Sequence, residues 1–280
     1  MSGMPNLPVR FGGTTFSFMW QITALEAMRK LRPLGLNDFD VITVPGHLWP
    51  EEMTTDQRRT LRWELEGEGT RLESLNVPAL DVNLASCVSA VRKSAVECYR
   101  TVFQLSAELG GKGVVVVPGR VSGLLPPALS DSVNWLSESM LELLAVAREL
   151  DQTVLMESHP QTPIPRYPEI LEFIERFGDS RLKVAYDVAN AEFIGESQKE
   201  ALIALSKHLG QLHLSDATRT SWKHDRVGKG SIDFKEVLET LEEIGFQGVS
   251  IVEVISSAAE QDTRQSVQLL TEMLPKEGLE

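Results

Sequence analysis

The sequence is short of the residues on which several classes of protein depend. Cys87 and Cys98 are the only cysteines among 280 residues, which is too few for a disulfide framework. Lys and Arg number 27 against 40 Asp and Glu, and a net charge of -13 does not suit binding to nucleic-acid phosphates or anionic lipids. No apolar run reaches the roughly 18–20 residues of a membrane span. These shortages argue against a disulfide scaffold, a nucleic-acid partner and a membrane partner.

The chain also begins without a recognisable targeting segment. Its first residues, Met-Ser-Gly-Met-Pro-Asn-Leu, lack the charged and apolar parts of a signal peptide. Together with the low cysteine content, this predicts a cytoplasmic protein. Hydrophobic residues at 42% and charged residues at 24% are ordinary for a globular protein, and the length suits an α/β barrel of about 250 residues.

Hydrophobic periodicity predicts eight strands that alternate with eight helices. The strands are expected at residues 14–18, 40–44, 77–82, 113–117, 153–157, 182–187, 211–215 and 249–253, and the helices at 24–34, 54–75, 89–109, 131–150, 167–177, 197–209, 234–244 and 260–274. Such alternation implies a parallel sheet, because each return needs a crossover. Without a linker or composition break, we expect one α/β domain over residues 1–280, a closed (β/α)8 TIM barrel. An open doubly wound sheet is the runner-up, but no Gly-x-Gly-x-x-Gly follows the first strand.

Four of the expected strands end in residues that bind metals. Glu157, Asp187, His213 and Glu253 stand at or near the carboxyl ends of strands five to eight. In a barrel these ends meet at one face, where active sites lie. A single acid at such a position is more often a helix cap, and a single histidine is often a core residue. The combination instead predicts a divalent-metal site, with Mn²⁺, Mg²⁺, Co²⁺ or Zn²⁺ as candidates.

A metal in this setting suggests proton-transfer chemistry on a carbonyl compound. A divalent ion can polarise a sugar carbonyl and stabilise the enediolate that forms when a neighbouring proton leaves. Carboxylates on opposite sides of the reacting carbon can remove the proton from one face and return it on the other. We expect Glu157 and Glu253 to play these catalytic parts.

Five segments of the chain resemble the xylose isomerase-like TIM barrel superfamily, in its sugar phosphate isomerase/epimerase branch. The resemblance covers residues 16–274 and is carried by Met156-Glu-Ser-His159, Tyr186-Asp-Val-Ala-Asn190, Leu212-His-Leu-Ser-Asp216, Val227-Gly-Lys-Gly-Ser-Ile-Asp233 and Ile251-Val-Glu253. It implies one divalent metal, usually Mn²⁺, bound by Glu157, Asp187, His213 and Glu253. It also implies that the two Glu residues are the proton-transfer pair, that the substrate is a small carbohydrate-like molecule, and that the protein is a homodimer or homotetramer.

The same resemblance suggests residues that contact the substrate. Relatives often carry Asp-x-x-His on strand six, where this chain has Asn190, which can still hydrogen-bond a hydroxyl group. Epimerases often have an Arg six residues after the metal-binding His, a spacing that Arg219 fits. Asp216 lies near the same strand end as His213 and is expected in the substrate site as well.

Three histidines are further candidates for substrate contact. His224 begins a His-x-x-x-Gly segment like that of the apurinic endonucleases, but Trp222 stands where those enzymes have an acid. Those enzymes bind three zinc ions with more histidines than the five present here, so we interpret His224 as a substrate residue. His159 lies two residues after Glu157 and should face the same way. His47 lies in the second strand-to-helix loop. Arg120, after Pro118-Gly119, is suited to an anionic group.

Three functions remain open from the sequence. The leading interpretation is a metal-dependent isomerase or epimerase of a small sugar, keto-polyol or hydroxy-keto acid. A dehydratase, which is a lyase on the same scaffold, would lose water from the enediolate instead of reprotonating it. A non-catalytic sugar-binding barrel would keep metal and ligand binding without proton exchange.

Overall fold

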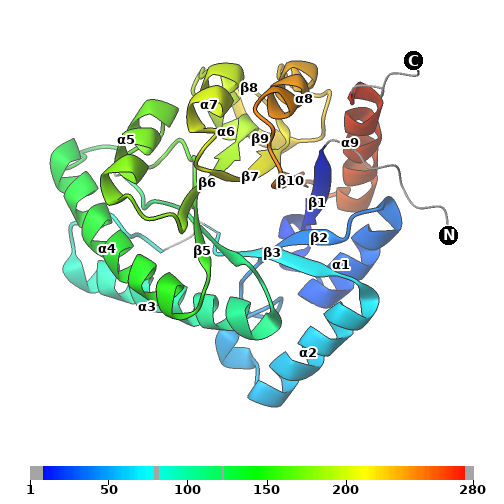
Figure 1. Ribbon diagram of the computed structural model, residues 1–280, viewed down its shortest axis with the longest axis horizontal. Helices are drawn as coiled ribbons and strands as arrows, with labels where there is room; N and C mark the ends of the chain where they lie inside the picture. The colour runs from blue at the N-terminus through cyan, green and yellow to red at the C-terminus, as the bar shows by residue number, and fades with distance from the viewer. Residues whose placement is uncertain (1–8, 79–81, 122, 275–280) are drawn as a thin grey trace.

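The computed structural model describes residues 9–78, 82–121 and 123–274, which form a closed barrel of parallel strands with helices around it (Figure 1). The order of strands around the barrel is β1 (Arg10–Thr14), β10 (Val249–Val252), β7 (Leu209–Leu214), β6 (Leu182–Asp187), β5 (Thr153–Glu157), β4 (Gly113–Val116), β3 (Arg71–Asn76) and β2 (Asp38–Ile42). The barrel closes because β1 pairs in parallel with both β10 and β2. The predicted (β/α)8 fold is therefore confirmed.

Helices follow the strands and cover the outside of the barrel (Figure 1). They are α1 (Ala24–Leu31), α2 (Thr55–Glu68), α3 (Ser89–Leu109), α4 (Leu129–Glu149), α5 (Tyr167–Phe177), α7 (Gln198–Leu205), α8 (Phe234–Glu243) and α9 (Ala259–Met273). Several begin at caps that the sequence provides. Thr23 and Thr54 each accept the third backbone N–H of their helix, and Glu26 and Gln57 return the bond. No helix in the described part of the chain is long and apolar enough to cross a bilayer.

The first strand lies earlier than the sequence predicts. β1 spans Arg10–Thr14, whereas part of the expected strand, Phe16–Phe18, forms a 3₁₀ helix. Glycine has low strand propensity, so the pattern at Gly12 and Gly13 does not indicate a strand. In the structure, a Cβ on Gly12 would lie 2.6 Å from the Asp38 carbonyl oxygen. Glycine is needed there because the neighbouring backbone approaches closely.

The predicted helix over residues 54–75 is wrong at its end. α2 stops at Glu68, because Gly69 adopts φ 67° and ends the helix in the left-handed conformation. The residues that follow form β3. The charges of this strand suggested a helix, but they make ion pairs: Arg71 binds Asp38 at 2.6 Å and Lys112 binds Glu73 at 2.6 Å. The strand expected at 77–82 falls partly at 79–81, outside the described residues, and residues 77 and 78 lie beyond the end of β3.

Two short elements lie between the predicted strands and helices. The helix α6 (Val188–Phe193) starts directly after β6, with the Asp187 carboxylate accepting the Asn190 N–H. Between the expected strand 211–215 and the expected helix 234–244, β8 (Asp216–Thr218) and β9 (Ser221–Asp225) form an antiparallel hairpin. The remaining predicted strands and helices occur within a few residues of their expected positions. The hairpin brings Trp222 and His224 to the mouth of the barrel.

Candidate metal centre

The four predicted metal ligands converge at the carboxyl ends of neighbouring strands. Glu157 ends β5, Asp187 ends β6, His213 lies one residue from the end of β7, and Glu253 follows β10. Strand register aligns them, since His213 pairs with Asp187 on one side and with Ile251 on the other. One ligand atom from each of the four residues lies within 4.8 Å of the others. The convergence on which the functional hypothesis depends is present.

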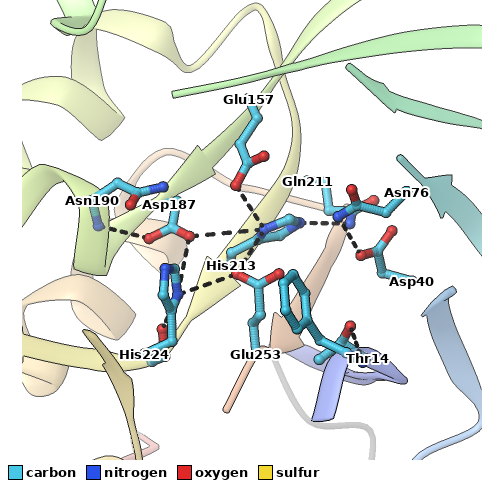
Figure 2. Close-up of polar contacts among 12 residues, drawn as sticks. Thr14, Asp40, Asn76, Glu157, Asp187, Asn190, Gln211, His213, His224 and Glu253 are labelled. Atoms are coloured by element: carbon cyan, nitrogen blue, oxygen red, sulfur yellow. Dashed lines mark hydrogen bonds and ion pairs between the residues drawn. The ribbon is translucent and has the colours of Figure 1, made fainter. Parts of the chain in front are cut away.

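His213 is at the centre of this group (Figure 2). Its Nδ1 atom lies 3.3 Å from Glu253 Oε2, 3.8 Å from Glu157 Oε1 and 3.9 Å from Asp187 Oδ2. Bonds of about 2.1 Å to one octahedral ion place adjacent ligand atoms about 3 Å apart. The spacing of the four side chains is therefore close to that of a coordination sphere.

Burial makes this cluster of charges costly in the absence of a cation. Asp187 and His213 are fully buried, and Glu253 and Glu157 are 2% and 7% exposed. Burial raises the pKa of Glu157 to about 8 and the pKa of Asp187 to about 6, and neighbouring carboxylates add to both shifts. Burial opposes ionisation of Glu253 too, but the positive charges of His213 and His224 hold its pKa well below the usual range.

Three buried atoms of the cluster have unused bonding capacity. Asp187 Oδ2, His213 Nδ1 and Glu253 Oε2 have no hydrogen-bond partner among the described residues. Buried polar atoms in folded proteins are nearly always partnered. Three carboxylate ligands and one imidazole form a donor set that suits a hard or borderline divalent ion. The residues therefore fit a metal ion, whose identity this donor set does not distinguish.

A cavity of about 230 Å³ opens beside the cluster. Five of the residues predicted to form the site line it: Glu157, His159, Asn190, His224 and Glu253. His224 comes closest to the metal ligands, since its Nδ1 lies 3.4 Å from Glu253 Oε2 and 3.6 Å from Asp187 Oδ2. His159 is packed edge-on to Trp222, and burial lowers its pKa to about 4. The wall of the cavity next to the predicted metal ligands is therefore polar.

Three other predicted substrate residues do not line this cavity. His47 bonds through its two ring nitrogens to the Ile22 carbonyl oxygen and Thr15 Oγ1. The Asp216 carboxylate accepts backbone N–H groups of Ala217, Gly228 and Ile232. Arg219 is largely exposed, with its Nε 3.9 Å from Glu192 Oε1. Substrate contact by these three residues stays a prediction.

Residues that the sequence interpretation did not propose complete the cavity wall. Phe16, Asn76 and Ile255 line it, and so does Trp222, whose indole N–H donates to Asn190 Oδ1 at 2.7 Å. A signal for Trp222 exists in the sequence, because it stands two residues before His224 and shares a face with it on a strand. No local pattern marks Phe16 or Asn76, because barrel closure brings them to the site.

A second groove has a volume of about 890 Å³. The loops after β4 and β5 contribute to both: Val117 and His159 line the inner cavity, and Arg120 and Pro160 line the outer groove. Asn83 holds the backbone of Arg120, accepting its N–H at 2.9 Å and donating to its carbonyl oxygen at 3.1 Å. The backbone of Arg120 is therefore held in place beside this groove.

Fold and site together define a class: a parallel barrel with a buried cluster of three carboxylates and one imidazole, able to hold a metal ion, at the carboxyl ends of its strands. Residues 28–273 match the family model of the xylose isomerase-like TIM barrel. Because that match covers most of the chain, the protein belongs to this family.

The individual relatives share about a quarter of their residues or fewer with this chain. An uncharacterised protein of Methanocaldococcus jannaschii is 26% identical over 274 residues, covering 96% of this chain and 90% of that protein. The L-ribulose-5-phosphate 3-epimerase UlaE of Shigella boydii is 22% identical and covers 87% of this chain and 86% of its own length. Among solved structures, a D-tagatose 3-epimerase-like protein superimposes with a TM-score of 0.83 at 22% identity, covering 95% of this chain and 97% of its own. The 3-keto-D-glucoside 4-epimerase YcjR of E. coli has a TM-score of 0.79 at 18% identity, with coverages of 94% and 99%.

Proposed function

We propose that this protein is a divalent-metal-dependent isomerase or epimerase of a small sugar, keto-polyol or hydroxy-keto acid. The observation that carries the proposal is that two carboxylates, Glu157 and Glu253, both line the cavity and approach His213 from opposite sides (Figure 2). The names of relatives that epimerise ribulose 5-phosphate and other sugars support the same reaction class.

The residues of this chain supply the binding and proton-transfer steps. Glu157, Asp187, His213 and Glu253 would hold the ion. When bound, a divalent ion supplies polarisation of the substrate carbonyl and stabilises the enediolate. One of the two Glu carboxylates takes the proton from the carbon next to the carbonyl, and the other delivers a proton to the opposite face. His159, Asn190 and His224 offer polar atoms to substrate hydroxyl groups, and Trp222 packs edge-on to His159 and hydrogen-bonds Asn190.

The proposed ion is Mn²⁺, with Mg²⁺, Co²⁺ and Zn²⁺ as alternatives. The donor set supports this range because oxygen ligands with one imidazole suit hard and borderline ions. Elemental analysis of protein purified without added metal tests it, with His213→Ala as the control. One equivalent of a divalent metal in the wild type, and little in the variant, is expected. Metal-free wild-type protein that also fails to bind added Mn²⁺ would contradict the proposal.

Solvent exchange tests the reaction. Incubation of a ketose and inosose panel with the Mn²⁺-loaded protein in D₂O should place deuterium on the carbon next to the carbonyl of a substrate. Mass spectrometry then separates the outcomes. An epimer or isomer has the mass of the substrate plus that of the incorporated deuterium, whereas a dehydratase product has lost water. Ligand binding without exchange across the whole panel would support the non-catalytic alternative instead.

A further inference from the structure

A buried row of polar side chains leads from His213 across the barrel interior. Gln211 Nε2 lies 3.0 Å from His213 Nε2, and Gln211 Oε1 lies 3.1 Å from Ser74 Oγ. Ser74 also donates to Asp40 Oδ1, and the other Asp40 oxygen accepts Asn76 Nδ2 at 2.9 Å. Gln211, Ser74 and Asp40, which we call the buried relay, are all at most 2% exposed. Figure 2 shows Gln211 between His213 and the Asp40–Asn76 pair.

The protons of the relay can be counted. Ser74 has one hydroxyl proton, yet Asp40 Oδ1 and Gln211 Oε1 are both acceptors. With Asp40 ionised, the conflict disappears when the amide of Gln211 is turned over, since its oxygen and nitrogen have the same shape. Gln211 then donates to Ser74, Ser74 donates to Asp40, and the Gln211 oxygen accepts a proton from His213 Nε2. Every group in the relay is then satisfied.

This arrangement determines which nitrogen of His213 is free. A metal binds the neutral imidazole, in which a proton on Nε2 leaves the lone pair on Nδ1. Nδ1 is the atom that faces Glu157, Asp187 and Glu253 without a hydrogen-bond partner among the described residues. We propose that the buried relay sets the tautomer of His213 and so prepares Nδ1 as the metal donor. Gln211, Ser74 and Asp40 are positioning residues, and the inference rests on the metal site and not on the reaction.

Reversing the donor and acceptor roles along the buried relay would block metal binding. Asp40→Asn imposes it while keeping the shape of the side chain. The new amide would accept from Asn76 and donate to Ser74, so Ser74 would donate to Gln211 Oε1. Gln211 would then donate to His213 Nε2, and the imidazole proton would move to Nδ1. This variant satisfies each hydrogen bond, yet it protonates the nitrogen that the metal needs.

Binding of Mn²⁺, followed by the EPR signal of the free ion, tests the proposal without any turnover. Asp40→Asn is expected to weaken Mn²⁺ binding about 10- to 100-fold, as is typical for residues that orient a metal ligand. Adding Gln211→Glu to this variant restores an obligatory acceptor for the Nε2 proton and restores the wild-type charge. The double variant should therefore bind Mn²⁺ within about threefold of the wild type, an effect too small to count as a lost hydrogen bond. Unchanged affinity in Asp40→Asn, or a double variant no tighter than the single one, would overturn the proposal.

A second variant covers the case in which Asp40→Asn does not fold. Gln211→Met keeps the length of the side chain and removes the acceptor for His213 Nε2. Thermal unfolding of the metal-free protein establishes that each variant is folded. Gln211→Met should also lose about 10- to 100-fold in Mn²⁺ affinity, and wild-type affinity in this folded variant would equally overturn the proposal.

Discussion

Glu157 ends β5 and Glu253 follows β10, two strands that have β6 and β7 between them, and their carboxylates meet over one imidazole. Side chains from different strands rarely bring three acids together in a buried space, because desolvation and mutual repulsion both oppose it. Here burial and the neighbouring acids raise the pKa of Glu157 and of Asp187. A bound cation would offset the cost of burying these charges. The carboxylates of Glu157 and Glu253 also line the cavity in which a substrate would react.

Replacing either carboxylate with its amide should abolish most proton exchange. Glu157→Gln and Glu253→Gln keep the side-chain shape but remove the base, so the rate of solvent-deuterium exchange is expected to fall about 10²- to 10⁴-fold. Metal content is measured for each variant, which separates loss of the base from loss of the ion. Glu260→Gln, on the exposed surface of α9, is the matched control. Full exchange activity in both metal-loaded variants would refute the catalytic assignment.

At the scale of elements, the hairpin β8–β9 delivers Trp222 and His224 to the cavity. Its position depends on Asp216, whose carboxylate accepts three backbone N–H groups. The Ile255 N–H also donates to the His224 carbonyl oxygen at 2.8 Å. A short two-stranded ribbon is only marginally stable alone, so these anchors hold it over the barrel.

Weakening the anchor should disturb the substrate site and leave the metal site intact. In Asp216→Asn one acceptor oxygen becomes a donor that faces a backbone N–H. We expect a loss of about 1–3 kcal/mol of stability, altered Trp222 fluorescence and a higher KM, with unchanged Mn²⁺ affinity. Equal fluorescence to the wild type combined with a large rise in KM would instead indicate that Asp216 touches the substrate directly.

Arg120, in the loop after β4, is expected to bind the phosphate of a phosphorylated substrate if the proposed function holds. Arg120 has no ion-pair partner in the described ranges, and Glu169, which lines the same groove, accepts the Arg166 N–H. Arg120→Gln should raise the KM for a ketose phosphate about 10- to 100-fold, because one charge-assisted contact is lost. The KM for the unphosphorylated ketose should not change. Lys30→Gln, in the last turn of α1, is the control. An equal effect on both substrates would contradict an anion site.

At the scale of the whole molecule, charged pairs close the barrel at the end opposite the metal site. Asp38 is 3% exposed and binds Arg71 through both carboxylate oxygens, at 2.6 and 2.7 Å. Burial opposes ionisation of Asp38, but Arg71 and Arg10 outweigh it and lower its pKa. These contacts join the starts of β2 and β3. Of these two strands, β3 is the one that sequence periodicity did not predict.

The pH dependence of stability should report this pair. A carboxyl group with a lowered folded pKa stabilises the protein above its unfolded pKa, near 3.8, and loses that contribution as the pH falls through the folded value. Asp38→Asn should therefore cost about 1–3 kcal/mol at pH 7 in urea unfolding of the metal-free protein. The difference from the wild type should shrink as the pH falls below 3.8. A gap that stays constant with pH would contradict this account.

Metal binding should also stabilise the whole barrel, since the ligands come from four strands. At a free metal concentration 100 times Kd, binding adds about 2.7 kcal/mol to the free energy of unfolding. For a chain of this size we expect the Tm to rise by about 5–10 °C on adding Mn²⁺ and to fall again with a chelator. A His213→Ala variant should show no such shift, and an equal shift in that variant would place the metal elsewhere.

Local sequence patterns were enough to predict the barrel and the four candidate metal ligands, because both depend on patterns within a few residues. Alternating strands and helices leave few other folds, and Glu157, Asp187, His213 and Glu253 each stand at a strand end that periodicity reveals. Sequence patterns did not predict the positions of β1 and β3. The glycines of β1 are explained by the close approach of β2, and the charges of β3 by ion pairs with residues outside it. The three-dimensional structure was needed to place the hairpin against the cavity and to reveal the row from His213 to Asp40, because barrel closure brings together residues that are far apart in the chain.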